Sequence, residues 1–291
     1  RDTEKGDIVY RVEEVEYLND NFYENGLIKS EVLKDAAGNK FTEKKNTYQL
    51  KDIHTGLNLD DIIKQKDDGE AFPALVKTEK LFYEGQPVAG KSTSTTFNFD
   101  KLVADKYIMD IPSSVTVSAS GKVYRQRGST IDGNGNTIQA QLYLEPAKIA
   151  KFDMTYDGFG NMTSLKRPEN ATGQRLKFTY LYDDQVQTYV TAISDDYGYS
   201  SSATYDFSFG QVLSATDMNG QQTQYTFDKA GRILTIRGPL EIATNRPFTI
   251  SFEYQPEAAV PWALAKHFDH ARPSAFVEFV SFSDGLEREI Q

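Results

Sequence analysis

Apolar and polar residues alternate with a period of two along most of this chain. The alternation is clearest in four segments rich in Val, Thr, Tyr and Phe, at residues 40–50, 114–120, 175–183 and 222–228. Successive side chains of a β-strand point to opposite faces, so this pattern predicts strands. We therefore expect a mostly all-β fold built from antiparallel hairpins.

Helical periodicity is weak and is confined to the first 110 residues. The best candidate is residues 58–69, which offers Asn58 as an N-cap, acidic residues in its first turn and Gly69 at its end. A second short candidate is residues 99–107. The N-terminal third is therefore expected to hold one or two short helices.

One turn signal recurs between the expected strands: an Asp, two residues and a Gly. The Asp side chain accepts hydrogen bonds from backbone N–H groups two residues on, and the Gly adopts the positive φ that closes a hairpin. The signal starts at Asp35, Asp132, Asp157 and Asp228, with a longer variant at Asp206 and a degenerate one at Asp284–Gly285, where Glu287 replaces the later Gly.

The spacing of these turns indicates repeated units. Asp132 and Asp157 are 25 residues apart, and Asp206 and Asp228 are 22 apart. The intervals from Asp157 to Asp206 and from Asp228 to Asp284 are 49 and 56 residues, about two periods each, and residues 180–186 and 251–257 fall where the intervening worn repeats would lie. A period of this size accommodates two strands and two turns, so each unit is expected to be a hairpin that stacks on its neighbours.

Composition favours an architecture with much surface per residue. Hydrophobic residues make up 39% of the chain, somewhat below the usual ~45–50%. Aromatic residues make up 12%, which argues against disorder. We expect the aromatic side chains to fill the space between strands and to pair across them.

Charge and cysteine content exclude several classes of function. The net charge is −10 and no basic stripe is present, which disfavours nucleic-acid binding. No apolar run reaches ~18 residues, so no membrane span is expected. The absence of Cys excludes disulfides and thiolate chemistry. The chain starts without Met and ends abruptly, so we expect a fragment of a longer protein.

Three segments, residues 155–165, 204–214 and 225–239, resemble YD repeats of the Rhs type. Those repeats pair an aromatic–Asp step with a Gly–Arg step. Gly231–Arg232 matches the second step fully, whereas polar residues follow Gly160 and Gly210. The residues assigned to the repeat motif are Tyr156, Asp157, Gly160, Tyr205, Asp206, Gly210, Phe227, Asp228, Gly231, Arg232, Asp284 and Gly285.

Over residues 115–291, the order of segments is similar to the repeat region of B components of insecticidal toxin complexes and of SpvB-associated relatives. The resemblance implies a curved or spiral β-sheet shell that encloses a cytotoxic polypeptide. It also implies a secreted or cell-surface location in bacteria. The implied partners are the rest of a longer chain and a C-terminal toxin or partner shell component. Nothing here matches the self-cleaving aspartyl site of that family.

The two parts of the chain differ in how strongly they carry the repeat signal. We expect residues 1–112 to be a β-rich N-terminal region with long excursions, and residues 113–291 to be the YD/Rhs-type repeat region. The open edges of such a sheet invite pairing with other strands, so some self-association is expected.

Catalytic and metal-binding motifs are weak. The start at Asp132 resembles a calcium loop, but Thr137 and Tyr143 stand where Gly and an acid are required. His267 and His270 would share a face on a helix, but not on the strand expected there. Adjacent acidic pairs such as Asp183–Asp184 are typical of solvated turns. No catalytic residue, cofactor or metal ion is therefore expected.

Two hypotheses of different classes remain. The leading hypothesis is a structural shell segment that encloses or presents a partner or toxin polypeptide. The alternative is a secreted or cell-envelope β-repeat module that binds carbohydrate or protein, since exposed aromatic side chains can form a platform for sugars. An enzyme is the weakest hypothesis.

Overall fold

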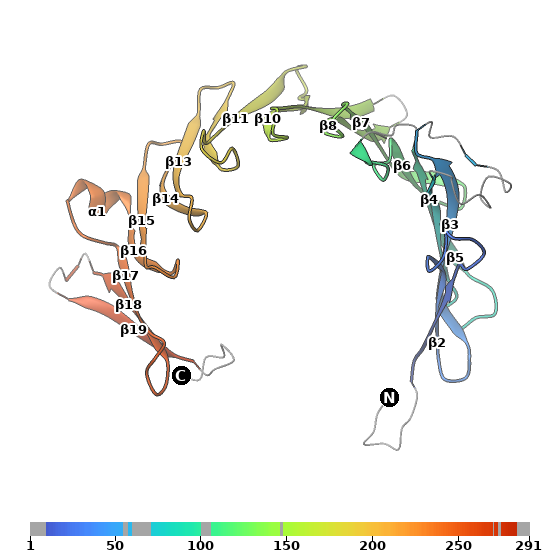
Figure 1. The fold of residues 1–291 in the computed structure, drawn as a ribbon, viewed down its shortest axis with the longest axis horizontal. Coiled ribbons are helices and arrows are strands. Elements are labelled where there is room, and N and C mark those ends of the chain that lie inside the picture. The colour runs from blue at the N-terminus through green and yellow to red at the C-terminus, as the bar shows by residue number, and fades with distance from the viewer. Residues whose placement is uncertain are drawn as a thin grey trace. The chain divides into compact units, whose positions relative to one another are not determined.

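The computed structural model describes residues 10–54, 58–59, 71–99, 106–145, 148–269, 271–272 and 275–283. These residues form 19 β-strands and one short helix (Figure 1). The chain divides into two compact units. The first contains residues 1–156 and 166–175, and the second contains residues 157–165 and 176–291.

In the first unit, strands that follow one another in sequence pair antiparallel. The buried hydrophobic side chains of the described residues all belong to this unit: Val32, Leu50, Ile53, Ala74 and Ile131. The strands are β1 (Val12–Tyr17), β2 (Ile28–Lys34), β3 (Lys40–Asp52), β4 (Ala71–Phe82), β5 (Lys91–Asn98), β6 (Ser114–Ala119), β7 (Lys122–Ile131), β8 (Thr137–Glu145) and β9 (Lys148–Tyr156).

Two strands, β10 (Met162–Glu169) and β11 (Arg175–Tyr182), run through the division between the units. The second unit then continues as an antiparallel meander in which consecutive strands pair. Its remaining strands are β12 (Val190–Asp195), β13 (Ser200–Asp206), β14 (Gln211–Thr216), β15 (Gln222–Phe227), β16 (Ile233–Arg237), β17 (Ile250–Gln255), β18 (Trp262–Phe268) and β19 (Phe276–Phe282).

The pairing register gives the sheet of the second unit two chemically different faces from β11 to β17. Paired residues share a face, and residues two apart on one strand share it too. The apolar face carries Phe178, Tyr180, Ile193, Ala203, Tyr205, Ala215, Tyr225, Ile236, Ile250, Phe252, Tyr254, His267, Val277 and Phe279. Over β11–β17 the other face, which we call the polar face, carries mainly hydroxyl and amide groups, at Thr179, Ser194, Ser202, Thr204, Ser214, Thr216, Gln222, Gln224, Thr226, Thr235 and Ser251, together with Leu181 and Ala192. Over β18 and β19 the same face is mostly apolar, with Trp262, Leu264, Phe268, Phe276, Val280 and Phe282.

Side chains on the polar face bond to one another. Thr204 and Ser214 join their hydroxyl groups at 2.8 Å, and Thr226 and Thr235 do so at 2.6 Å. The Gln224 amide donates to Gln222 Oε1 at 2.9 Å. The two hydroxyl pairs are cross-strand pairs, which each stabilise a sheet by roughly 0.2–1 kcal/mol, whereas the Gln224–Gln222 bond lies within β15.

The second unit has no thick hydrophobic core. Among its described residues, the buried side chains are those of Ser164, Asp183 and Glu241, all of them polar. The apolar face is covered only partly, by neighbouring side chains of the same face. This unit is therefore a single layer of sheet, in agreement with the low hydrophobic content of the chain.

The predicted fold class is confirmed: the structure is all-β, and its strands pair antiparallel in chain order. The four segments with the clearest alternation form β3, β6, β11 and β15. The boundary expected between residues 112 and 113 stays a prediction. β5 and β6 pair across that position, from Ser94↔Ser118 to Asn98↔Ser114.

The helices expected in the N-terminal third lie largely outside the described residues, which leave out 60–70 and 100–105. Asn58, expected as an N-cap, bridges to Lys51. The helix that the structure describes is α1 (Pro239–Ala243), between β16 and β17. Sequence periodicity could not reveal it, because five residues make little more than one turn. No helix of the described residues is long and apolar enough to cross a bilayer.

Candidate functional site: the Tyr–Asp turn row

Four hairpin turns begin at Asp157, Asp183, Asp206 and Asp228, and we call them the turn row. They join β9 to β10, β11 to β12, β13 to β14 and β15 to β16. Turns of an antiparallel meander alternate between its two ends, so these turns lie at the same end of successive hairpins. An aromatic residue precedes the Asp in every one of them.

The turn at Asp228 shows how the motif closes. Asp228 donates its N–H to Arg232 O at 2.9 Å, and Gly231 donates to Asp228 O at 3.0 Å. The carboxylate of Asp228 accepts from the backbone of Ala230 (2.8 Å) and Arg232 (2.9 Å), and from Arg232 Nε (2.7 Å). Gly231 has φ +78°, a left-handed conformation that costs glycine little. The pairing shifts by one residue between Thr226 and Phe227, which places a bulge beside the turn.

The same hydrogen bonds recur in the turn at Asp157, and in the first unit in the turns at Asp35 and Asp132. In each of these turns, an Asn after the Gly donates its side-chain amide to the second carboxylate oxygen. The residue after the Gly can therefore be Asn or Arg, because both supply a donor.

The turn at Asp183 is longer and encloses its carboxylate. The Asp183 side chain is only 5% exposed. It accepts five backbone N–H groups at 2.6–3.1 Å, from residues Gln185, Val186, Gln187, Thr188 and Tyr189. One carboxylate thus organises the whole loop, and Gln187 adopts φ +55° within it.

Tyrosine hydroxyls connect four of the hairpins to the preceding turn, and Phe227 is the one position of the turn row without a hydroxyl. In three cases the hydroxyl donates to the backbone carbonyl of the second residue after the Gly of the preceding turn. In the fourth case it donates to the carbonyl of Val190, the first residue of β12, which follows the Asp183 turn. The bonds run from Tyr156 to Thr137 (2.9 Å), from Tyr182 to Met162 (3.1 Å), from Tyr205 to Val190 (2.9 Å) and from Tyr254 to Ile233 (2.9 Å). The aromatic residue of the motif therefore bonds to one turn while the adjacent Asp closes the next.

The residue after each Gly makes contacts in the opposite direction, toward the following turn. Asn161 Nδ2 donates to Gln187 O at 2.6 Å, and Gln211 Nε2 donates to Gly231 O at 2.8 Å. The Arg232 guanidinium lies 4.7 Å from the centre of the Tyr254 ring. Each turn is thus bonded on both sides.

Aromatic side chains also lie against the glycines of the following turns. A Cβ atom added to Gly231 would be 3.0 Å from the Phe209 ring, and one added to Gly210 would be 2.5 Å from the Tyr189 hydroxyl. The rings of Tyr189 and Tyr205 stack at 4.9 Å between centroids. At these two positions glycine serves both the turn and the close packing of neighbouring turns.

Comparison with known proteins supports this interpretation of the motif. Residues 205–240 match the sequence model of the RHS repeat family. The chain carries an RHS repeat. The matched segment includes the turns at Asp206 and Asp228, and it confirms the resemblance to YD/Rhs repeats. A search of curated protein sequences finds no significant match.

Solved structures share the fold beyond the RHS repeat. A chain in the crystal structure of TcdB2-TccC3-Cdc42 superposes with a TM-score of 0.54 and 12% identity, covering 92% of this chain. The structure of the Photorhabdus luminescens Tc holotoxin pore, with a TccC3 mutation, gives 0.53 and 13% over 92%. The chain spans 23% of the length of each of these solved chains.

The structure brings most of the predicted motif residues together. Tyr156, Asp157, Gly160, Tyr205, Asp206, Gly210, Phe227, Asp228, Gly231 and Arg232 all lie in the turn row or on the strand ends beside it. The Asp206 turn, longer by one residue, keeps the bond from Ser208 N to Asp206 Oδ1 at 2.8 Å. Asp284 and Gly285 lie outside the described residues.

Spacing alone placed worn repeats at residues 180–186 and 251–257, which contain Tyr182–Asp183 and Tyr254, and sequence reasoning missed three further turns. The Tyr182–Asp183 pair divides the long interval between Asp157 and Asp206, but its extended loop has no Gly at the usual distance. Tyr254 makes the backward hydrogen bond although Gln255, not Asp, follows it. Three further turns of the same geometry close the other end of the hairpins, at Asn170, Asp195 and Asp217. The Asp- or Asn-x-x-Gly spacing could have revealed these three.

The turns lower the pKa of their carboxyl groups. At Asp228 the N–H of Arg232 is the main cause, and at Asp217 the N–H of Gln221 is. At Asp183 desolvation opposes ionisation, but the N–H groups of the loop outweigh it and hold the pKa far below its usual range. Burial raises the pKa of the Tyr182 and Tyr254 hydroxyls, so both remain protonated donors.

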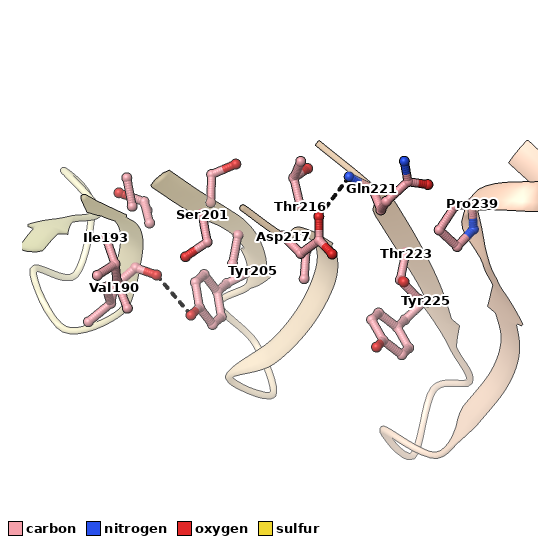
Figure 2. Close-up of a pocket in the computed structure, with 15 residues that line it drawn as sticks. Val190, Ile193, Ser201, Tyr205, Thr216, Asp217, Gln221, Thr223, Tyr225 and Pro239 are labelled. Carbon is pink, nitrogen blue, oxygen red and sulfur yellow. Dashed lines mark hydrogen bonds between the residues drawn. The ribbon is translucent and has the colours of Figure 1, made fainter. Parts of the chain in front are cut away.

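A cavity of about 430 Å³ lies between Tyr205 and Tyr225, with Pro239 of α1 at one side (Figure 2). Its one carboxyl group, Asp217, already accepts N–H groups from Asn219 (2.8 Å) and Gln221 (2.8 Å). The rest of the lining is apolar, hydroxyl or amide. The cavity thus presents packing surface and tyrosine rings rather than an acid–base pair.

The weaker candidate sites have structural roles where the structure describes them. The carboxylate of Asp132 accepts from Asn134 and from both the backbone and the side chain of Asn136. His267 lies on β18 and packs against the edge of the Phe279 ring at 5.4 Å, and His270 lies outside the described residues. No group of three metal-binding side chains is found in the described part of the chain.

Proposed function

We propose that this chain is a wall segment of an Rhs-type shell that encloses or presents a partner polypeptide. The observation that carries the proposal is the single-layer antiparallel meander whose turns are bonded to their neighbours on both sides. Each hairpin is stabilised by adjacent hairpins, so the architecture extends by adding repeats. The fold shared with chains of the TcdB2-TccC3 structures supports this assignment.

The two faces of the second unit fit a wall better than an isolated globule. Over β11–β17, one face is mainly apolar and only partly covered, and the other is mainly a band of hydroxyl and amide groups. A wall must meet different surroundings on its two sides. The partners in this proposal are the remainder of a longer shell and a C-terminal toxin or partner component, with secretion from a bacterium.

The chain's own residues are proposed to perform no catalysis. The carboxylates of Asp157, Asp183 and Asp228 accept hydrogen bonds from their own turns, which lowers their pKa and keeps them ionised. A general acid or base needs a carboxyl group that can exchange a proton near neutral pH, and these pKa shifts run in the opposite direction.

Site-specific photo-crosslinking in the natural gene product tests the proposal. Ser202 and Ala203 are neighbours on β13 that lie on the polar and the apolar face, so they form a matched pair. A photoreactive residue at one of these positions should crosslink to an enclosed polypeptide, and the other position should not. Absence of polypeptide crosslinks from both positions would contradict the shell.

The alternative function is a carbohydrate-binding module. The exposed aromatic side chains Tyr197 (69% exposed) and Tyr199 (56%) near the Asp195 turn favour it, because exposed rings can stack on sugars. A glycan array with the 291-residue chain separates the two functions. Selective binding that is lost in Tyr197→Ala would favour the module over the shell.

A further inference from the structure

The cavity between Tyr205 and Tyr225 is a hollow in the apolar face of the second unit (Figure 2). Its floor consists of small side chains. Ala203 pairs with Ala215, and Ala215 pairs with Thr223, so these three lie side by side on β13, β14 and β15. The volume of about 430 Å³ falls within the range of ~300–1,000 Å³ that is typical of ligand pockets. The hollow therefore has the size of a binding pocket.

The neighbouring repeats show which side chain is absent from this hollow. The strands β11, β13, β15 and β17 each carry an aromatic residue at or next to their C-terminal end, and a second side chain lies two residues earlier on the same face. This second position is Tyr180 on β11, Tyr225 on β15 and Phe252 on β17, but Ala203 on β13. The aromatic series is thus interrupted on β13, and the cavity lies at the interruption. The missing group is one aromatic side chain.

The walls of the cavity are fixed before anything binds. The Tyr205 hydroxyl donates to Val190 O at 2.9 Å, and the Tyr205 ring stacks on Tyr189 at 4.9 Å between centroids. Pro239, whose ring restricts its backbone, closes one side at the start of α1. A preformed pocket lowers the ordering cost of binding.

The charge of the lining favours a neutral or cationic group over an anion. The described residues that line the cavity include no basic side chain. Asp217 is exposed, and the N–H of Gln221 lowers the pKa of its carboxyl group and keeps it ionised. An anion in the cavity would therefore be repelled. Ser201 and Thr223 add hydroxyl groups, which can bond to the amide groups of a peptide.

We propose that the cavity between Tyr205 and Tyr225 binds one aromatic side chain of a partner polypeptide. The bound ring takes the place of the aromatic side chain that β13 lacks, against the methyl groups of Ala203 and Ala215. Aromatic side chains that fill such pockets are the usual anchors of protein interfaces. The inference rests on the proposed function, in which the sheet encloses or presents a polypeptide.

Binding of N-acetyl-phenylalaninamide to the 291-residue chain, followed by ligand-detected NMR, tests the pocket. The probe is neutral and carries one aromatic ring between two amide groups. It should bind saturably, and roughly tenfold more tightly than N-acetyl-alaninamide, because the ring buries apolar surface that a methyl group does not. N-acetyl-phenylalanine, which is an anion at neutral pH, should bind more weakly than the amide.

Three variants make the test specific to the cavity. A203F supplies the missing ring from the chain itself and should weaken binding of the probe by roughly tenfold. A203L fills the cavity with a smaller group and should weaken binding by a smaller factor. S202F is the matched control: it places the same ring on the adjacent residue of the polar face and should bind the probe as the wild type does. Circular dichroism checks that each variant is folded.

Any of three results would overturn the proposal. These are the absence of saturable binding, an unchanged affinity in the folded Ala203 variants, and tighter binding of free phenylalanine than of the blocked amide. The last result would assign the pocket to a free small molecule. The shell is judged separately, by crosslinks to an enclosed polypeptide, so the pocket and the shell can fail independently.

Discussion

The aspartate at the start of each turn acts as a local anion for backbone N–H groups. A hairpin loop leaves several N–H groups without strand partners, and each unsatisfied buried group is costly. Asp183 is the extreme case, with five N–H groups on one buried carboxylate. Its charge is compensated by N–H dipoles rather than by a basic side chain.

The first prediction concerns that carboxylate. Asp183→Asn should lower the thermal unfolding midpoint more than any other single Asp→Asn change in the turn row, because an amide NH₂ would face N–H donors. The matched control is Asp184→Asn, since Asp184 is its exposed neighbour. Circular dichroism melts check both. Equal midpoints for the two variants would show that the loop does not depend on the carboxylate.

The tyrosine hydroxyls give a second prediction. Tyr254→Phe removes the bond to Ile233 O and should cost about 1 kcal/mol of unfolding free energy. Phe227 stands where the motif has Tyr, so Phe227→Tyr should place a hydroxyl near Val212 O and stabilise the protein by a similar amount. Urea unfolding monitored by fluorescence measures both. A destabilised Phe227→Tyr variant would mean that the hydroxyl has no acceptor there.

Acidic pH should destabilise the fold, because the turn carboxylates become protonated. Asp157, Asp217 and Asp228 have folded-state pKa values below their ordinary values. A lowered folded pKa stabilises the fold above the unfolded value, near pH 4, and this stabilisation is lost as the pH falls through the folded value. Thermal midpoints should therefore be level from neutral pH to about pH 4.5 and fall below roughly pH 4. A midpoint unchanged down to pH 2 would contradict this.

At the scale of elements, hairpins are joined by contacts between consecutive turns. A tyrosine reaches back, the residue after the glycine reaches forward, and an aromatic ring covers the next glycine. None of these contacts forms within a single hairpin. An isolated two-stranded hairpin is marginally stable in water, so the row of turns supplies part of what a second layer would otherwise provide.

Alanine substitutions at two glycines distinguish the free-energy cost of backbone strain from the cost of disturbed packing. Gly231 and Gly220 have similar φ values, +78° and +75°, but a Cβ atom meets Phe209 at 3.0 Å at Gly231 and nothing within 4 Å at Gly220. Gly220→Ala should cost about 1–2 kcal/mol from the left-handed backbone alone. Gly231→Ala should cost clearly more. Denaturant unfolding compares them, and equal losses would remove the packing role of Phe209.

The sequence predicts the strands and the regular turns because their determinants are local. Asp, Gly and a donor at fixed distances are visible in the chain, as at Asp157 and Asp228. The Asp183 loop is not predictable in this way, because its closure depends on one carboxylate reaching residues up to six positions away. The carbonyl group that accepts each tyrosine hydroxyl bond cannot be predicted from the sequence either. It lies about 15–21 residues earlier in the chain, and its position depends on the strand register.

At the scale of the whole molecule, the structure is a chain of neighbour-to-neighbour pairings. Within each unit, the described strands pair with the strands that precede and follow them in sequence. The second unit also lacks a fully buried hydrophobic side chain among its described residues. Such a sheet becomes more stable as strands are added at its edges, and its two faces remain available to other molecules.

Electron cryomicroscopy of the gene product that carries this sequence, purified from its native cell, tests the shell most directly. The account predicts that residues 10–283 form part of a continuous β-sheet wall. Polypeptide density should then lie against one face of β11–β19. A sheet with both faces open to solvent and no enclosed polypeptide would contradict it.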